Sequence, residues 1–117
     1  MPNKISLNNI IMNVVHTDGI GVVNTDTYFH FKQEENIITA NYSGGGITKG
    51  FLVGKLDNEK FEFRYAQLQT DGKLDGGYSD CEVKILEDGR VQIIEHFQWE
   101  SREGTGTNIF EEIKESP

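Results

Sequence analysis

The 117-residue chain has few cysteines, prolines and tryptophans. It contains one cysteine, two prolines and one tryptophan. The single cysteine, Cys81, cannot form an internal disulfide, and cysteine-poor chains are typical of a reducing compartment. No stretch approaches the ~18 apolar residues of a membrane-spanning helix, and no apolar segment follows a basic start as in a signal peptide. The sequence therefore predicts a cytoplasmic protein with no membrane partner.

Basic residues are also scarce. The chain has 11 lysines and arginines against 19 aspartates and glutamates, which gives a formal net charge of −8. A nucleic-acid partner needs clustered lysine and arginine, and no basic stripe is present. Hydrophobic residues make up 36% of the chain, which is low but regularly spaced. At this length we expect one domain over residues 1–117, with an acidic surface and no nucleic-acid partner.

Helical periodicity is nearly absent, and alternation of apolar and polar residues replaces it. Residues 60–69 read K-F-E-F-R-Y-A-Q-L-Q, and residues 91–99 read V-Q-I-I-E-H-F-Q-W. Alternation with aromatic and β-branched residues is typical of half-buried strands. The predicted strands are residues 5–15, 19–23, 26–33, 36–43, 47–56, 60–69, 74–86 and 90–102, with residues 105–113 either a last strand or a helical turn.

Turn sequences separate these segments. Residues 70–72 (T-D-G) and 87–89 (E-D-G) have the form of a three-residue hairpin loop that ends in a left-handed glycine. Asn58 can take the positive φ of a third hairpin. The connections are too short for crossover helices, so the sheet should be an antiparallel, up-and-down meander. Closure into an all-β barrel of about eight strands removes both sheet edges, and an open two-sheet sandwich is the alternative.

The two glycine-containing loops also fix the strand register. A loop at residues 87–89 places Cys81 opposite Glu95, and a loop at residues 70–72 places Phe61 opposite Cys81. Both registers turn the same parity of residues inward. That inward set is Phe61, Phe63, Tyr65, Gln67, Cys81, Val83, Ile85, Val91, Ile93, Phe97 and Trp99.

The inward face changes character along the barrel, from apolar at one end to polar and aromatic at the other. Eight-stranded barrels can hold one small ligand at the mouth. The predicted ligand-binding residues are Tyr65, Gln67, Ser79, Glu95 and Trp99. The alternative is that these residues are hydrogen-bonded core polar groups and an aromatic plug. Glu95 is the most informative, because a buried carboxylate needs a partner. Arg64 or Arg102 could be that partner if a bulge shifts the register locally.

Other candidate chemistry has a simpler structural explanation. Glu62, Asp80 and His96 should lie side by side on the outer face, where they could bind a metal or transfer protons. An ordinary cross-strand polar face explains them as well, and we expect neither a metal nor a cofactor. Cys81 is expected to be a small core residue. Residues 43–50 (S-G-G-G-I-T-K-G) lack the order of a phosphate-binding loop and are expected to form a flexible connection, with covering of the barrel mouth as an alternative role.

Several stretches resemble a family of small, uncharacterised bacterial proteins, some of which carry the label "N-acetylglutamate synthase". The resemblance covers residues 42–113 well and the first forty loosely, and its main stretches are residues 42–54, 65–67, 75–82, 95–101 and 104–112. The family has no established catalytic residues to carry over. The glycine-rich meander also resembles avidin-type and lipocalin-type barrels at the level of the fold. The R/Q-x-x-G-x-G/A loop and following helix of common acetyltransferases are absent.

Three functions follow as hypotheses. The leading one is a non-enzymatic barrel that binds a small molecule at its polar end. The second is an enzyme, which would use acyl transfer as the label implies, or acid–base chemistry on Glu95 or His96. The third is a structural homodimer without a ligand, associated through an outward apolar stripe of Ala66, Leu68 and Ile94.

Overall fold

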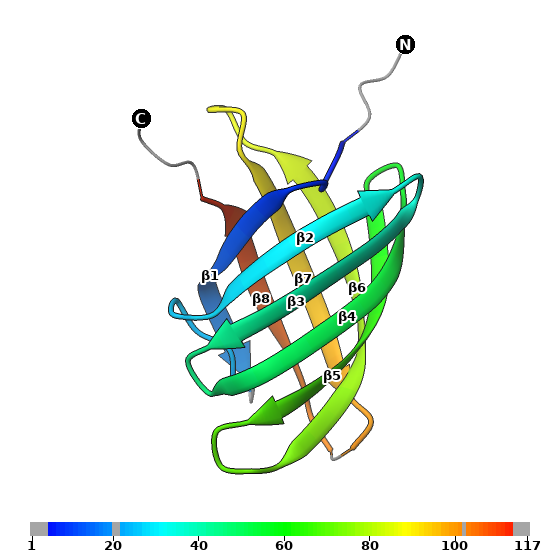
Figure 1. Ribbon diagram of the computed structural model, residues 1–117. Coiled ribbons are helices and arrows are strands. Elements are labelled where there is room, and N and C mark those ends of the chain that lie inside the picture. The colour runs from blue at the N-terminus through cyan, green and yellow to red at the C-terminus, as the bar shows by residue number, and fades with distance from the viewer. Residues whose placement is uncertain (1–4, 20–21, 102, 114–117) are drawn as a thin grey trace.

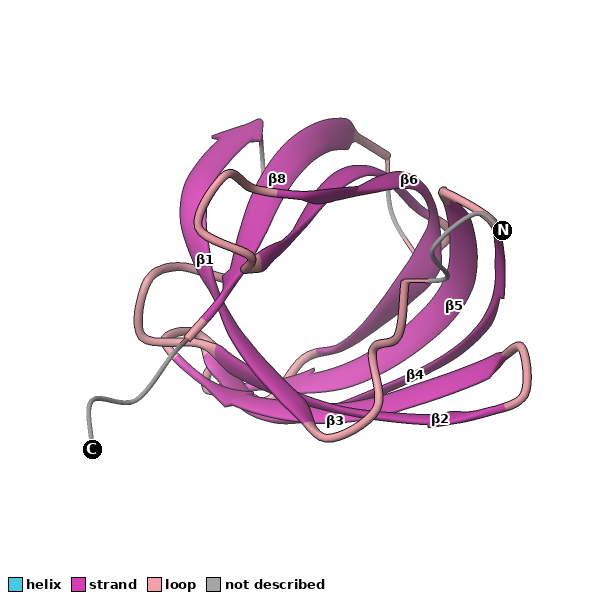
Figure 2. Cartoon of the chain, turned by 90° about the horizontal axis from the view of Figure 1, so that it is seen from above, coloured by secondary structure: helices cyan, strands magenta, loops and turns pink. Residues whose placement is uncertain are grey.

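The computed structural model describes residues 5–19, 22–101 and 103–113. Eight antiparallel strands form a closed barrel in which each strand pairs with the next and β8 pairs with β1 (Figures 1 and 2). The strands are β1 (Ile10–Gly19), β2 (Tyr28–Glu34), β3 (Ile37–Gly44), β4 (Ile47–Asp57), β5 (Lys60–Gln69), β6 (Leu74–Ile85), β7 (Val91–Trp99) and β8 (Thr105–Glu112). The described residues contain no helix, and so none that could cross a membrane. The predicted all-β, up-and-down barrel is confirmed.

The hairpins form where the turn residues predict them. Gly72 and Gly89 have φ values of 89° and 92°, and Asn58 has φ of 58°. With the turns fixed, Phe61 lies opposite Cys81 and Cys81 opposite Glu95, as the sequence predicts. A slip of one residue would turn every core side chain to the outside, so these two turns determine what the barrel contains.

The barrel interior is one hydrophobic core. Part of it lies at the end where β2, β4 and β6 finish, which is the upper end in Figure 1. Phe31, Phe61 and Val83 are almost completely buried there. Leu7 is also fully buried, because residues 5–9 lie across this rim instead of forming a strand, as Figure 2 shows. The Leu7 backbone N–H donates to Gln33 Oε1 at 2.8 Å, and Asn9 has φ of 63°. The predicted strand 5–15 is therefore wrong in its first half, since the positive φ ends strand geometry before Ile10.

The two ends of the chain close the barrel differently from the prediction. β1 runs on to Gly19 through a register shift between Val14 and His16. Of the predicted strand 19–23, Val22 and Val23 belong to no strand, and residues 20–21 lie outside the described residues. Residues 105–112 form a strand, which resolves the choice between strand and helical turn. β8 must be extended because it provides the hydrogen-bonded partner for both β7 and β1.

Two further expectations are wrong. Ile85 is 53% exposed although its parity is inward, because it lies at the end of β6, at the rim of the barrel.

Residues 43–50 do not form a flexible loop. β3 continues to Gly44 and β4 begins at Ile47, which leaves a two-residue turn. Gly44 has φ of 105°, and a Cβ built on it would lie 2.0 Å from the Asp26 carbonyl oxygen. This turn is packed tightly against the β1–β2 connection and cannot act as a cover for the barrel mouth.

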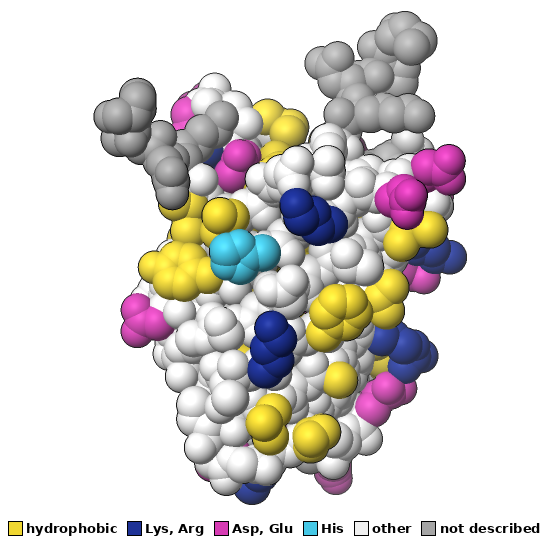
Figure 3. Space-filling view, viewed as in Figure 1, with side chains coloured by type: hydrophobic (Ala, Val, Ile, Leu, Met, Phe, Trp, Pro, Cys, Tyr) yellow, Lys and Arg dark blue, Asp and Glu magenta, His cyan; other side chains and the backbone are white. Residues whose placement is uncertain are grey.

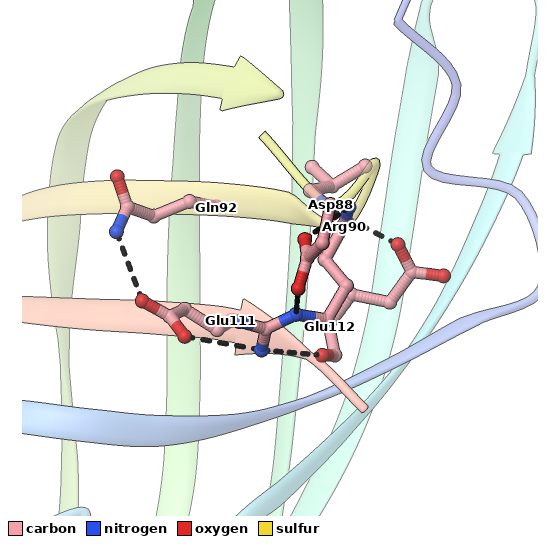
Figure 4. Close-up of polar contacts among 6 residues, drawn as sticks. Asp88, Arg90, Gln92, Glu111 and Glu112 are labelled. Carbon is pink, nitrogen blue, oxygen red and sulfur yellow. Dashed lines mark hydrogen bonds and ion pairs between the residues drawn. The ribbon is translucent and has the colours of Figure 1, made fainter. Parts of the chain in front are cut away.

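Arg90, just before β7, joins the β6–β7 turn to the last strand (Figure 4). Its Nε lies 2.7 Å from Asp88 Oδ2, and its guanidinium lies 3.2 Å from Glu111 Oε1. Beside it, Glu112 Oε1 accepts a hydrogen bond from the Val91 backbone N–H at 3.0 Å. These side-chain contacts thus hold β8 against β7.

We expect Arg90→Ala to lower the melting temperature and to raise the pKa of the Asp88 carboxyl part of the way to its ordinary value, since the backbone N–H of residue 90 still donates to Asp88 Oδ1. The hydrogen bond from Arg90 is the main reason that the pKa of Asp88 lies below its usual value. An NMR pH titration of Asp88 measures the change. Lys60→Ala is the matched control, because Lys60 is 77% exposed and its ammonium lies 3.9 Å from Glu82. An unchanged Asp88 titration in Arg90→Ala would contradict this role.

Exposed apolar side chains lie on the outer surface among charged and polar ones (Figure 3). Ala66 and Leu68 are exposed and Ile94 is half-buried, while Phe51 and Val53 on β4 are each about half exposed. Phe51 lies opposite Ala66 in the strand register, so the outward apolar positions continue from β5 to β4. Association of two copies through these positions remains a prediction.

Candidate ligand site at one end of the barrel

A small cavity lies near the end of the barrel at which β5 and β7 finish, which is the lower end in Figure 1. It measures about 30 Å³ as space open to the centre of a water molecule, which is room for about two waters. Its lining residues are Val22, Val23, Phe29, Tyr42, Tyr65, Gln67, Glu95, Phe97, Trp99 and Asn108. Four of the five predicted site residues are among them. The fifth, Ser79, is 1% exposed and does not line the cavity, but its hydroxyl donates a hydrogen bond to Glu95, which does.

Glu95, on β7, is a buried carboxylate with two hydrogen-bond donors. Ser79 Oγ donates to Oε2, and Asn108 Nδ2 donates to Oε1 at 2.9 Å. Burial raises the pKa of the Glu95 carboxyl above its usual value, and these two hydrogen bonds oppose the rise. Neither expected arginine partner is seen: the Arg64 guanidinium instead lies 2.8 Å from Glu100 on the outer surface, and Arg102 lies outside the described residues.

Asn108, on β8, is the main site residue that the sequence did not reveal. It is 3% exposed, and its Nδ2 is held by Glu95. Its Oδ1 is buried and accepts no hydrogen bond from any residue within 5–19, 22–101 or 103–113. The signal that would have found it is the β7–β8 register, which places Asn108 directly opposite Glu95. That register could not be assigned while residues 105–113 fitted a strand or a helical turn.

A chain of side-chain hydrogen bonds forms another wall of the cavity. Tyr42 OH donates to Gln67 Oε1 at 2.8 Å, and Gln67 Nε2 donates to Gln69 Oε1 at 3.2 Å. Burial, with a contribution from the Glu95 charge, raises the pKa of Tyr42 far above its usual value, so its hydroxyl stays protonated as the donor. The Tyr42 ring lies over Gly50, where a Cβ would be 2.3 Å from ring carbons. Glycine is required there for Tyr42 to occupy this position.

Aromatic rings make up most of the remaining wall. Tyr65 and Trp99 have ring centroids 5.8 Å apart with planes at 67°, and Phe97 and Trp99 are 5.7 Å apart at 70°. The Phe29 ring stacks on Tyr42 with centroids 4.4 Å apart. Steeply tilted neighbours present ring faces in different directions, so these residues can enclose a ligand group from more than one side.

Val22 and Val23 complete the lining from the β1–β2 connection. Both are half-buried and pack against the core. The sequence places them in a strand, because their β-branched side chains follow the strand pattern. They lie instead in irregular backbone, because β1 ends at Gly19 and β2 does not begin until Tyr28. These two are the lining residues that belong to no strand, and they are therefore the least constrained by hydrogen bonds between strands.

The predicted outer cluster forms as an ordinary cross-strand face. Glu62 lies opposite Asp80, and Asp80 lies opposite His96. All three are exposed, Glu62 lies 3.6 Å from the Lys55 ammonium, and His96 Nδ1 lies 3.3 Å from Thr107 Oγ1. The described part of the chain holds no group of three side chains placed to bind a metal.

Cys81 is 4% exposed, and burial raises the pKa of its thiol, as expected of a core residue.

The closed eight-stranded meander, with a small cavity at one end, has the architecture of an up-and-down β-barrel. The chain matches the family of avidin-like proteins over residues 5–113 and belongs to that family. The predicted resemblance to avidin-type barrels is thereby confirmed. No curated protein and no solved structure matches the chain.

Proposed function

We propose that this protein binds a small molecule at the lower end of the barrel, through Tyr65, Gln67, Glu95, Trp99 and Asn108, with Ser79 holding Glu95. The observation that carries the proposal is that Asn108, one of the lining residues, has a buried acceptor, Oδ1, with no donor among the described residues. A buried polar atom left without a partner costs free energy, so a donor is expected to occupy the cavity. Small-ligand binding in the barrel is also how the avidin type of fold is used.

The size of the cavity limits what can enter it. Sites for drug-sized ligands enclose ~300–1,000 Å³, an order of magnitude more than the cavity of about 30 Å³ seen here. Only a head group of two or three non-hydrogen atoms therefore fits between Glu95 and the aromatic rings. The rest of a larger ligand would lie in the mouth beside Val22 and Val23, in place of these side chains or over them.

Trp99 makes the proposal directly testable, because it is the only tryptophan in the chain and lines the cavity. We expect at least one member of a panel of small cationic, neutral and anionic compounds to change its fluorescence and to raise the melting temperature. A ligand present at 100 times its Kd adds about 2.7 kcal/mol to the free energy of unfolding.

Val23→Phe should abolish that response by filling the mouth, with only a small effect on stability because Val23 is half-buried. Val53→Phe is the matched control, since Val53 is 50% exposed on the outer surface and should leave binding unchanged. Equal responses from wild type and Val23→Phe would place the ligand elsewhere and contradict the proposal.

A further inference from the structure

The wall of the cavity carries negative charge and acceptor atoms but no basic group. Its lining residues include the Glu95 carboxylate and the Asn108 carbonyl oxygen, and none of them is lysine, arginine or histidine. Both oxygens of Glu95 accept hydrogen bonds, from Ser79 and Asn108. Two donors and no acceptor are the arrangement that suits an ionised carboxylate, which can only accept.

No counter-charge for Glu95 is present in the part of the chain that the structure describes. The ion pairs found there join outer side chains, such as Arg64 with Glu100 and Lys55 with Glu62. A buried charge that is hydrogen-bonded but not paired is unfavourable in a low-dielectric interior. A cation that enters the cavity would supply the counter-charge that Glu95 lacks among the described residues.

Asn108 points to the same chemistry independently of charge. Its Nδ2 must face Glu95, because a carboxylate cannot donate to Oδ1, and this fixes Oδ1 as the acceptor left for a ligand. A group that satisfies both Asn108 and Glu95 must carry at least two N–H or O–H donors. An ammonium group has three donors and no acceptor.

The aromatic walls favour a positive group as well. Ring faces carry the negative part of the aromatic quadrupole and attract cations within about 6 Å of the centroid, tryptophan most strongly. Tyr65, Phe97 and Trp99 all line the cavity with steeply tilted planes, and Glu95 shares β7 with Phe97 and Trp99. Aromatic rings that surround a small site are a recurring arrangement for holding ammonium groups.

We infer that the ligand is a small primary amine, bound as its ammonium ion between Glu95, Asn108 Oδ1 and the rings of Tyr65, Phe97 and Trp99. This inference rests on the proposed function and adds the chemical class of the ligand. The size of the cavity selects the primary ammonium: the nitrogen and one methylene match the room for about two waters, whereas the planar guanidinium group has four non-hydrogen atoms.

The test compares three probes of one shape and different charge, n-propylammonium chloride, 1-propanol and sodium propionate, at pH 7.5 and constant ionic strength. Trp99 fluorescence reports occupancy of the cavity. We expect n-propylammonium to bind at least tenfold more tightly than 1-propanol, and propionate to bind more weakly than either. This comparison uses the wild-type chain alone and so does not depend on the folding of any variant.

Glu95→Gln should remove the preference, with n-propylammonium binding at least tenfold more weakly than to wild type and 1-propanol binding unchanged. Glu62→Gln is the matched control, because Glu62 is exposed on the outer face and should leave all three affinities as they are. The same loss in Glu62→Gln would show that overall negative charge attracts the amine, and would overturn the inference.

The remaining outcomes separate the inference from the proposed function. Binding of 1-propanol or N-methylacetamide as tightly as n-propylammonium would overturn the amine assignment and leave a neutral-ligand site in place. Tighter binding of propionate would do the same in favour of an anion site. If no compound in either panel changed Trp99 fluorescence or the melting temperature, the proposed function and the inference would both fail.

Discussion

Phe61→Ala should lower the free energy of unfolding by about 3–5 kcal/mol, a large part of the ~5–15 kcal/mol that stabilises a domain of this size. Phe61 is 1% exposed, and its ring centroid lies 5.1 Å from that of Phe63 and 6.4 Å from that of Phe31. Alanine would lose these contacts and leave a cavity that β-strands held in a closed barrel cannot easily collapse around. Urea denaturation monitored by circular dichroism measures the change.

Phe51→Ala is the control with the same change of side chain. Phe51 is 51% exposed on β4, so its truncation should cost less than about 1 kcal/mol. The pair of variants tests the strand register itself, because a slip of one residue would exchange inside and outside along a strand. Equal losses from Phe61→Ala and Phe51→Ala would be incompatible with the register described above.

Glu95→Gln should make the protein more stable than wild type at neutral and higher pH, but not in acid. The pKa of Glu95 is raised in the folded state by burial, while in the unfolded chain it keeps its ordinary value of about 4.3. Between these two pKa values the folded state holds a proton that the unfolded state has lost. Rising pH therefore costs wild type up to about 1.4 kcal/mol per pH unit in this window, and glutamine does not titrate.

The amide can keep the local hydrogen bonds: it accepts from Ser79 and, if the Asn108 amide turns over, donates to Asn108 Oδ1. The charge of Glu95 also affects the pKa of Tyr42 and of Cys81. Burial and this charge both raise these pKa values, so neither side chain should ionise between pH 4 and 8. Urea denaturation across that range measures the difference between variant and wild type.

Glu62→Gln should change stability by less than about 0.5 kcal/mol at every pH, because Glu62 is 61% exposed. A wild type that gains stability relative to Glu95→Gln as the pH rises would contradict the argument. That result would mean that the hydrogen bonds from Ser79 and Asn108 outweigh the cost of burying the Glu95 charge.

The predictable part of the fold depends on particular turns. The glycines at positions 72 and 89 define loop lengths locally, and each loop length fixes the pairing of two whole strands. Cys81, Ser79 and Glu95 could be placed inside the barrel by this reasoning alone. The first strand had no such turn at its start, and its predicted start at residue 5 was too early because Leu7 resembles a strand residue in composition only. Its predicted end at residue 15 was also too early, since β1 runs on to Gly19.

The candidate site was predictable to the extent that it lies on the β5–β6–β7 register. Tyr65, Gln67, Glu95 and Trp99 follow from that register, whereas Asn108 and Val22 lie on segments with no fixed register in the sequence. The partner of Glu95 was also missed. Long arginine side chains can reach solvent from a strand, and Arg64 pairs with Glu100 on the outer face instead of turning inward.

The scarcity of cysteine, proline and apolar runs, together with regular alternation, determined by itself that this chain forms an antiparallel meander with one inward face. These are local properties, because strand period and turn type depend on neighbouring residues. Only the tertiary structure decided that β8 closes against β1, that a cavity of about 30 Å³ remains at one end of the barrel, and that Asn108 lies beside Glu95. Those facts depend on side-chain volumes summed over strands that are distant in sequence, and on which ends meet when the barrel closes.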